Sequence, residues 1–96
     1  MNTPETRITG QPQGKTIVLG ESLTVSVKAQ GIGLKYQWYF KKKGETSWSV
    51  WKGRTHASES VTPNESWNRI QIHCRIKDSS GKVIKTNDVT ITVTDK

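Results

Sequence analysis

The chain has 96 residues with 15 Lys and Arg against 8 Asp and Glu, so its formal net charge is +7 and its pI is near 9.8. This length fits a single domain over residues 1–96, because two domains of about 48 residues would each be near the size that needs disulfides or metals. One cysteine excludes an intrachain disulfide, and Cys74, His56 and His73 are one ligand short of a four-ligand zinc site, so no metal or cofactor is expected.

Alternating apolar and polar residues predict β-strands along most of the chain. The alternation is clearest in segments 23–29, 34–41, 70–77 and 89–94, and it places successive side chains on opposite faces of a strand. Turn residues interrupt it every 8–12 residues or so, the spacing typical of an all-β sandwich or barrel. No segment has helical apolar spacing, so no helix is expected. The predicted strands lie near residues 5–9, 15–19, 22–30, 34–42, 47–52, 55–62, 67–77 and 82–94.

Two further features concern individual segments. Strand 55–62 is the weakest of these predictions, because Glu59 stands where the inward pattern of Ala57 and Val61 would place an apolar residue.

No apolar run approaches the 18 or so residues of a transmembrane helix, and the polar start of the chain predicts no signal peptide. The polar ends on either side of residues 8–93 are expected for a module excised from a larger protein.

Several short strings occur in a characteristic order and spacing. They are Ile8-Thr9-Gly10-Gln11-Pro12, Gly20-Glu21-Ser22-Leu23, Tyr36-Gln37-Trp38, then Gly44, Trp48 and Cys74, then Asp78-Ser79-Ser80-Gly81 and Val89-Thr90-Ile91-Thr92-Val93. Over residues 8–93 this order resembles the bacterial immunoglobulin-like domains found as modules in surface and secreted proteins. The resemblance implies an all-β, Greek-key sandwich of two sheets with seven to eight strands.

The resemblance also assigns the core. Trp38 takes the place of the tryptophan of strand C, and Cys74 lies on strand F. Val27 stands where strand B would carry the partner cysteine, and Ile72 stands where a tyrosine corner would place its Tyr. The implied sandwich therefore has no disulfide, and it depends on packing around Trp38, Val27, Ile72 and Cys74, together with Val25 and Ile91.

The sequence contains few candidate catalytic residues. The adjacent Cys74 and His73 form the one tempting nucleophile and base, yet neighbours on a strand point to opposite faces. We therefore expect Cys74 to be a buried small hydrophobe and His73 a solvated histidine on the outer face. A glycine loop that binds a nucleotide would need a following helix, and none is predicted. The sequence indicates a protein that is not an enzyme.

Basic charge marks one predicted surface. Strands C and F are neighbours in the immunoglobulin topology, with G beyond F. Like charges opposite one another destabilise a sheet, so their crowding indicates an anionic partner. The other interpretation, which the sequence by itself favours, is a solvated face that discourages aggregation. The predicted face comprises Lys35, Tyr39 and Lys41 from strand C and Arg69, His73, Arg75 and Lys77 from strand F.

The remaining tryptophans have no clear pattern. Trp48 follows strand C and is expected to cover the sandwich edge, while Trp51 and Trp67 are expected to cap opposite ends of the core. If exposed, they could stack on sugar rings or anchor a protein interface.

The leading hypothesis for the role is a non-catalytic, extracellular module of a bacterial surface or secreted protein, acting as a spacer, adhesion or presentation unit. Expected partners are neighbouring modules of the parent and, through the basic face, an acidic polysaccharide or an acidic protein surface. We expect a monomer without membrane insertion. The competing hypothesis is an intracellular nucleic-acid binder, which the pI of 9.8 invites. It is less favoured, because such proteins use several stacking aromatics and the basic face offers Tyr39 alone.

Overall fold

The computed structural model describes residues 6–95 and has only strands and one short 3₁₀ turn within them, none of it a helix that could cross a bilayer. The elements are β1 (Arg7–Gly10), β2 (Lys15–Val18), β3 (Leu23–Ser26), β4 (Lys28–Gln30), β5 (Lys35–Lys41), β6 (Ser49–Val50), β7 (Ser58–Val61), η1 (Glu65–Trp67), β8 (Ile70–Lys77), β9 (Val83–Lys85) and β10 (Val89–Thr94).

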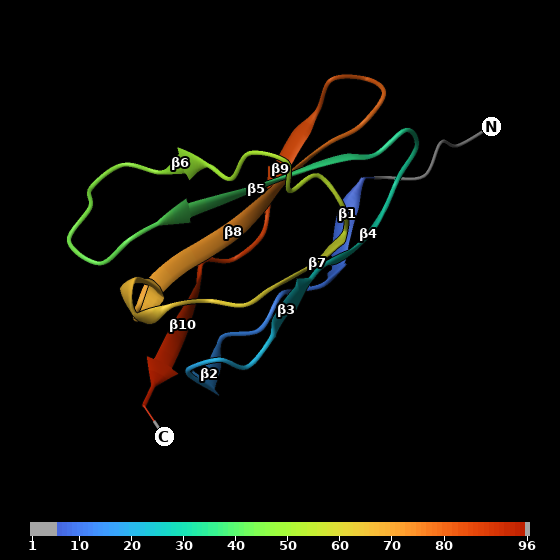
Figure 1. Ribbon diagram of the computed structural model, residues 1–96. Helices are drawn as coiled ribbons and strands as arrows, with labels where there is room; N and C mark the ends of the chain where they lie inside the picture. Colours follow the sequence, from blue (N-terminus) through green and yellow to red (C-terminus); the bar gives the residue numbers. More distant parts are fainter. Residues whose placement is uncertain (1–5, 96) are drawn as a thin grey trace.

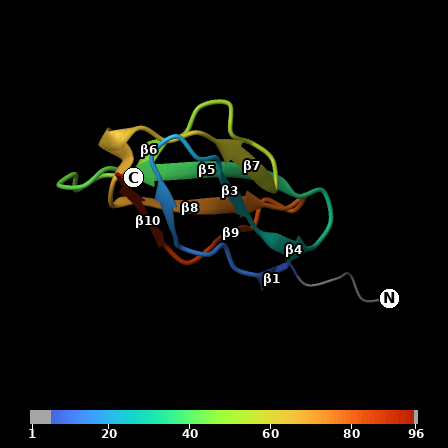
Figure 2. The same cartoon turned by 60° about the horizontal axis from the view of Figure 1, so that its bottom comes forward.

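The strands form two layers (Figures 1 and 2). The larger sheet has the order β2-β10-β8-β5-β6, and β9 also pairs with β8. All its pairs are antiparallel except β2 with β10, which run parallel. The second layer consists of the antiparallel ribbons β1-β4 and β3-β7. The predicted all-β sandwich is therefore confirmed.

The core lies between the layers and centres on Trp38, which is fully buried. Cys74 is its direct partner across the β5-β8 pair, and the Trp38 indole Nε1–H donates a hydrogen bond of 2.7 Å to the carbonyl oxygen of His56. This bond satisfies the one polar group that a buried tryptophan carries. The buried apolar residues are Ile17, Leu23, Val25, Val27, Trp38, Ile70, Ile72, Cys74, Ile76, Val89, Ile91 and Val93, which include all six predicted core residues.

Two of the eight predicted strands are each interrupted, so residues 6–95 form ten strands. Segment 22–30 changes partner at Val27, whose N–H donates to the carbonyl of Ala57, so β3 pairs with β7 and β4 pairs with β1. Segment 82–94 breaks at Thr86. The hydroxyl of Thr86 accepts a hydrogen bond from the Cys74 N–H at 2.9 Å, which places a side chain where the ladder would continue.

Other boundaries differ from the prediction for local reasons. The one departure from strands and loops in residues 6–95 is η1, a single 3₁₀ turn, where the Asn64 side chain accepts a hydrogen bond from the Ser66 N–H. The predicted strand 67–77 therefore begins at Ile70, after Arg69 adopts a left-handed φ of 65°. The predicted strand 47–52 shortens to β6. Residue 5 of the first predicted strand lies outside the described residues.

The apolar position expected at 59 holds a buried carboxylate. Glu59 is 7% exposed, and its oxygens accept hydrogen bonds from Arg54 Nη1 at 3.2 Å and from the His56 N–H at 3.0 Å. Its second oxygen also lies 2.9 Å from His56 Nδ1. Burial by itself raises the pKa of Glu59, but the hydrogen bonds from His56 and Arg54 hold that pKa below its ordinary value. β7 can therefore form with a charged residue facing inward, because Arg54 and His56 pair with the Glu59 carboxylate.

Candidate functional site

The predicted basic residues share one face of the larger sheet. In the β5-β8 pair, Lys35 lies opposite Lys77, Tyr39 opposite His73, and Lys41 opposite Gln71. Arg75 lies opposite Gln37 in the same register. Directly opposed residues point to the same side of a sheet, so these side chains all leave the side away from the core. We call this surface, with Arg69 just before β8, the outer face.

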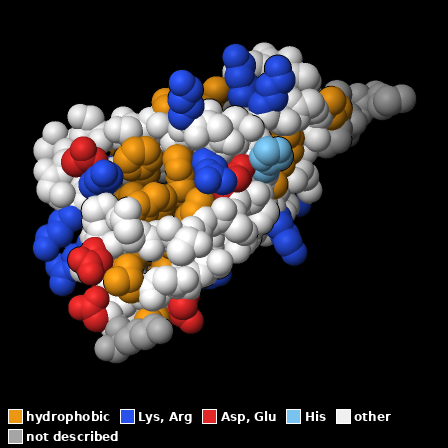
Figure 3. Space-filling view, in the orientation of Figure 1, with side chains coloured by type: hydrophobic (Ala, Val, Ile, Leu, Met, Phe, Trp, Pro, Cys, Tyr) orange, Lys and Arg blue, Asp and Glu red, His pale blue; other side chains and the backbone are white. Residues whose placement is uncertain are grey.

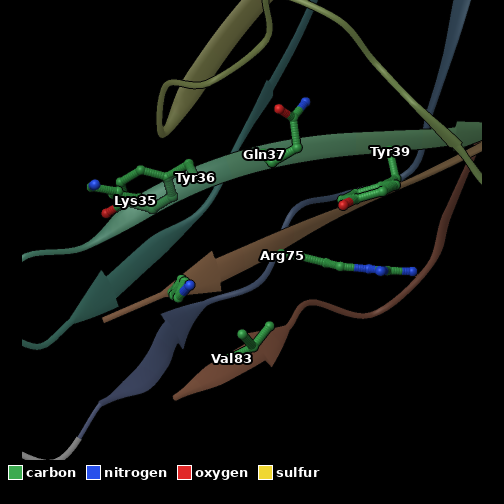
Figure 4. Close-up of a pocket in the computed structure, with 7 residues that line it drawn as sticks. Lys35, Tyr36, Gln37, Tyr39, Arg75 and Val83 are labelled. Atoms are coloured by element: carbon green, nitrogen blue, oxygen red, sulfur yellow. The ribbon is translucent and has the colours of Figure 1, made fainter. Parts of the chain in front are cut away.

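One end of the outer face has a hollow of about 340 Å³ with three basic residues in its lining (Figure 4). Among the described residues that line it none is acidic, and Lys35, Arg75 and Lys77 form no ion pair with any carboxylate of residues 6–95. The Arg75 guanidinium lies 4.1 Å from the centre of the Tyr39 ring. We call this 340 Å³ hollow the first hollow. Its lining residues are Lys35, Tyr36, Gln37, Tyr39, Arg75, Lys77 and Val83.

The opposite end of β5 and β8 has a second hollow of about 250 Å³. Here the loop after β5 approaches Arg69. Arg69 precedes β8 and is not part of it, but it still lies beside the other predicted basic residues. The one acidic residue in its lining, Glu45, accepts a hydrogen bond of 2.8 Å from the Lys42 N–H and thereby closes the loop turn. The second hollow is lined by Lys41, Lys42, Lys43, Gly44, Glu45, Arg69 and Gln71.

An aromatic group separates the two hollows. His73 is not solvated as expected but fully buried, because Trp48 folds back from the loop and places its ring 4.1 Å from the imidazole, nearly edge-on. Tyr39 stacks on the imidazole, with 5.4 Å between the ring centres and an angle of 11° between the ring planes. Trp48 therefore covers the outer face rather than the sandwich edge. We call Tyr39, Trp48 and His73 the aromatic saddle; Lys41 Nζ lies 5.1 Å from the Trp48 ring centre.

The hydrogen bonds of His73 define its tautomer. Its Nε2 accepts from Arg75 Nε at 3.2 Å, and since arginine only donates, the neutral ring carries its hydrogen on Nδ1. Nδ1 lies 3.4 Å from Asp88 Oδ1 and makes no hydrogen bond within the described residues. Burial lowers the pKa of His73; Asp88 opposes this effect, while Arg75 and Lys85 add to it. The imidazole is therefore neutral at pH 7.

The structure separates the residues that could have formed a nucleophile and base. Cys74 points into the core and is fully buried, and burial raises the pKa of its thiol to about 12. His73 points to the outer face from the neighbouring position. Within residues 6–95, no group of three His, Cys, Asp or Glu side chains is placed to hold a metal ion. The geometry around Cys74 therefore provides no thiolate for nucleophilic chemistry.

A second aromatic group lies on another surface. Trp51 and Trp67 are 5.1 Å apart at their ring centres, and Phe40 lies 6.3 Å from Trp51. The prediction that the two tryptophans cap opposite ends of the core is therefore wrong. Figure 3 shows a patch of hydrophobic side chains on the face in view, with basic and acidic side chains beside it. Arg54 lies 5.6 Å from the Trp51 ring centre. No spacing in the sequence indicated this contact, because it joins a loop to η1.

Comparisons with known proteins address the fold. No protein-family model matches the chain, and no curated protein matches it. Solved structures do. The chain is similar to an immunoglobulin domain in the titin–obscurin-like 1 complex, at 16% identity and a TM-score of 0.65, with 95% of each chain covered.

A second similar structure is that of the tandem immunoglobulin repeats of Dlar, at 17% identity and a TM-score of 0.65. There 98% of this chain covers 51% of the other, so this chain spans about half of that longer one. A mutant form of the titin–obscurin-like 1 complex aligns over 99% of this chain at 12% identity, also with a TM-score of 0.65. Together with the two-layer topology, these likenesses show that the chain has an immunoglobulin-like fold.

Proposed function

We propose that this chain is a non-catalytic module of a bacterial surface or secreted protein, and that it serves as a spacer and adhesion unit whose outer face binds an anionic polymer. The observation that carries the proposal is the first hollow, which Lys35, Arg75 and Lys77 line without a carboxylate partner among residues 6–95. Directly opposed lysines repel one another across a sheet, and a bound anion would relieve that repulsion.

The path of the chain supports the spacer role. β1 begins at Arg7 opposite Gln30, at the end of the sandwich where Ser79 donates a backbone hydrogen bond to Ile32. β10 ends at Thr94 opposite Val18, at the other end of the sandwich. Modules with this path can be joined end to end, as the name of the tandem repeats of Dlar describes for that protein. The titin complex likewise pairs immunoglobulin domains of two proteins.

A salt-dependent titration tests the binding role. We expect heparin-derived oligosaccharides to shift NMR signals of β5 and β8, with affinity falling steeply as salt shortens the screening length of about 8–10 Å. Lys35→Glu with Lys77→Glu should weaken binding and remove the shifts at the first-hollow end of β5 and β8. The matched control is Arg7→Glu with Lys28→Glu, which makes the same change of charge on the β1-β4 ribbon of the second layer.

The same titration separates the alternatives. Neutral oligosaccharides that shift Trp51 and Trp67, with no response to anions, would replace this proposal with a carbohydrate-stacking site on the second aromatic group. Tighter binding of a single-stranded oligonucleotide than of any acidic sugar would favour the nucleic-acid hypothesis, with Tyr39 and Trp48 as stacking surfaces. Absence of binding by every anion would refute an anion-binding outer face.

A further inference from the structure

We propose that the outer face binds one extended anionic polysaccharide laid along β5 and β8, so that a single chain contacts the first hollow, crosses the aromatic saddle and reaches the second hollow. This inference rests on the proposed function and adds the length and direction of the ligand. It predicts discrimination against small anions such as sulfate or a single acidic sugar.

The separation of the two hollows requires an extended ligand. Lys35 and Lys41 lie on the same face of one uninterrupted strand and are six residues apart, which corresponds to about 20 Å at 3.3–3.4 Å per residue. That distance is about twice the screening length at physiological salt, so the two basic groups do not act together on one small ion. A chain that reaches both gains because its second contact is intramolecular.

The surface between the hollows favours a sugar chain. Tyr39 and Trp48 are half-buried, so each residue leaves part of its surface exposed on the outer face. Aromatic rings pack against the apolar faces of sugar rings. Cations border the saddle toward both hollows, Arg75 over Tyr39 at 4.1 Å and Lys41 over Trp48 at 5.1 Å. An acidic polysaccharide has apolar sugar faces for the aromatic rings of the saddle and negative charges for the cations on either side of it.

Three acidic residues lie near the face. Asp78, directly after β8, lines a further hollow together with Lys35 and Lys77. Asp88 is half exposed and lies next to His73 just before β10, so it repels an anion from the β10 side of β8. Glu45 is tied to the Lys42 N–H in the loop turn. The cations that line the two hollows lie on β5, in the loop after it, and on or just before β8, and this strip is the track we assign to the ligand.

Calorimetry with heparin-derived oligosaccharides of graded length tests the inference. A disaccharide should bind weakly, and affinity should rise by about a hundredfold or more when the oligosaccharide is long enough to reach both hollows. First-hollow variants (Lys35→Glu with Lys77→Glu) and second-hollow variants (Lys42→Glu with Lys43→Glu) should each lose this rise but keep weak binding of short sugars. The control variant, Arg7→Glu with Lys28→Glu, should keep the rise.

The outcomes separate this inference from the function on which it rests. If short and long oligosaccharides bind equally, or if the second-hollow variant binds the long one as the wild type does, the extended track is wrong and a single anion site at the first hollow remains. If no anionic sugar binds at all, both proposals fail. The four substituted lysines are exposed, so we expect each variant to fold. Far-UV circular dichroism checks this and separates a loss of the length-dependent affinity from a loss of folding.

Discussion

Replacing Trp38 should remove much of the stability of this domain. Its side chain is the largest of those that are fully buried, and truncation of such a residue to Ala costs about 3–5 kcal/mol in typical cores. Trp38→Ala also leaves the His56 carbonyl without the 2.7 Å hydrogen bond, which adds about 1 kcal/mol. The sum of about 4–6 kcal/mol is comparable with the roughly 5–15 kcal/mol that stabilises an ordinary domain.

Trp38→Phe separates the two contributions, because it keeps a buried aromatic ring and removes the indole N–H. We expect it to lower the free energy of unfolding by about 1–3 kcal/mol, well short of the alanine variant. Guanidinium chloride denaturation followed by far-UV circular dichroism measures both, since this signal does not depend on the replaced fluorophore. An alanine variant that loses less than about 1.5 kcal/mol would contradict the central place of Trp38 in the core.

Three further predictions concern the buried polar groups. Native Cys74 should resist thiol reagents at pH 8 because its pKa is raised to about 12, and Cys74→Val should change stability little; fast labelling would contradict this. The pKa of His73 is lowered from 6.5, so the unfolded chain binds more protons and the free energy of unfolding should fall as the pH drops below about 6.5. Denaturation at several pH values should show this fall, and His73→Phe should reduce it. Glu59→Gln should destabilise by about 1–3 kcal/mol, and a cycle with Arg54→Met should show that the two effects are not additive.

The face that each strand residue takes could be predicted from the sequence alone. Side chains on a strand alternate with period two, so the apolar series Ile70, Ile72, Cys74 and Ile76 identifies the buried side of β8 without knowledge of its neighbours. The same local rule assigned the basic residues of β5 and β8 to the opposite side. The resemblance to immunoglobulin-like domains then predicted that these strands are adjacent, and their register confirms it.

What covers each face was decided only by the tertiary structure. His73 has the outward position that its alternation predicts, yet it is buried because Trp48 returns from a loop that no periodic pattern describes. Glu59 is tolerated inside because Arg54 and His56 reach it from the preceding loop. Trp51 meets Trp67 through a similar long-range contact. Alternation is a property of neighbouring residues, whereas burial and charge pairing depend on segments that are distant in the chain and meet only in the folded sandwich.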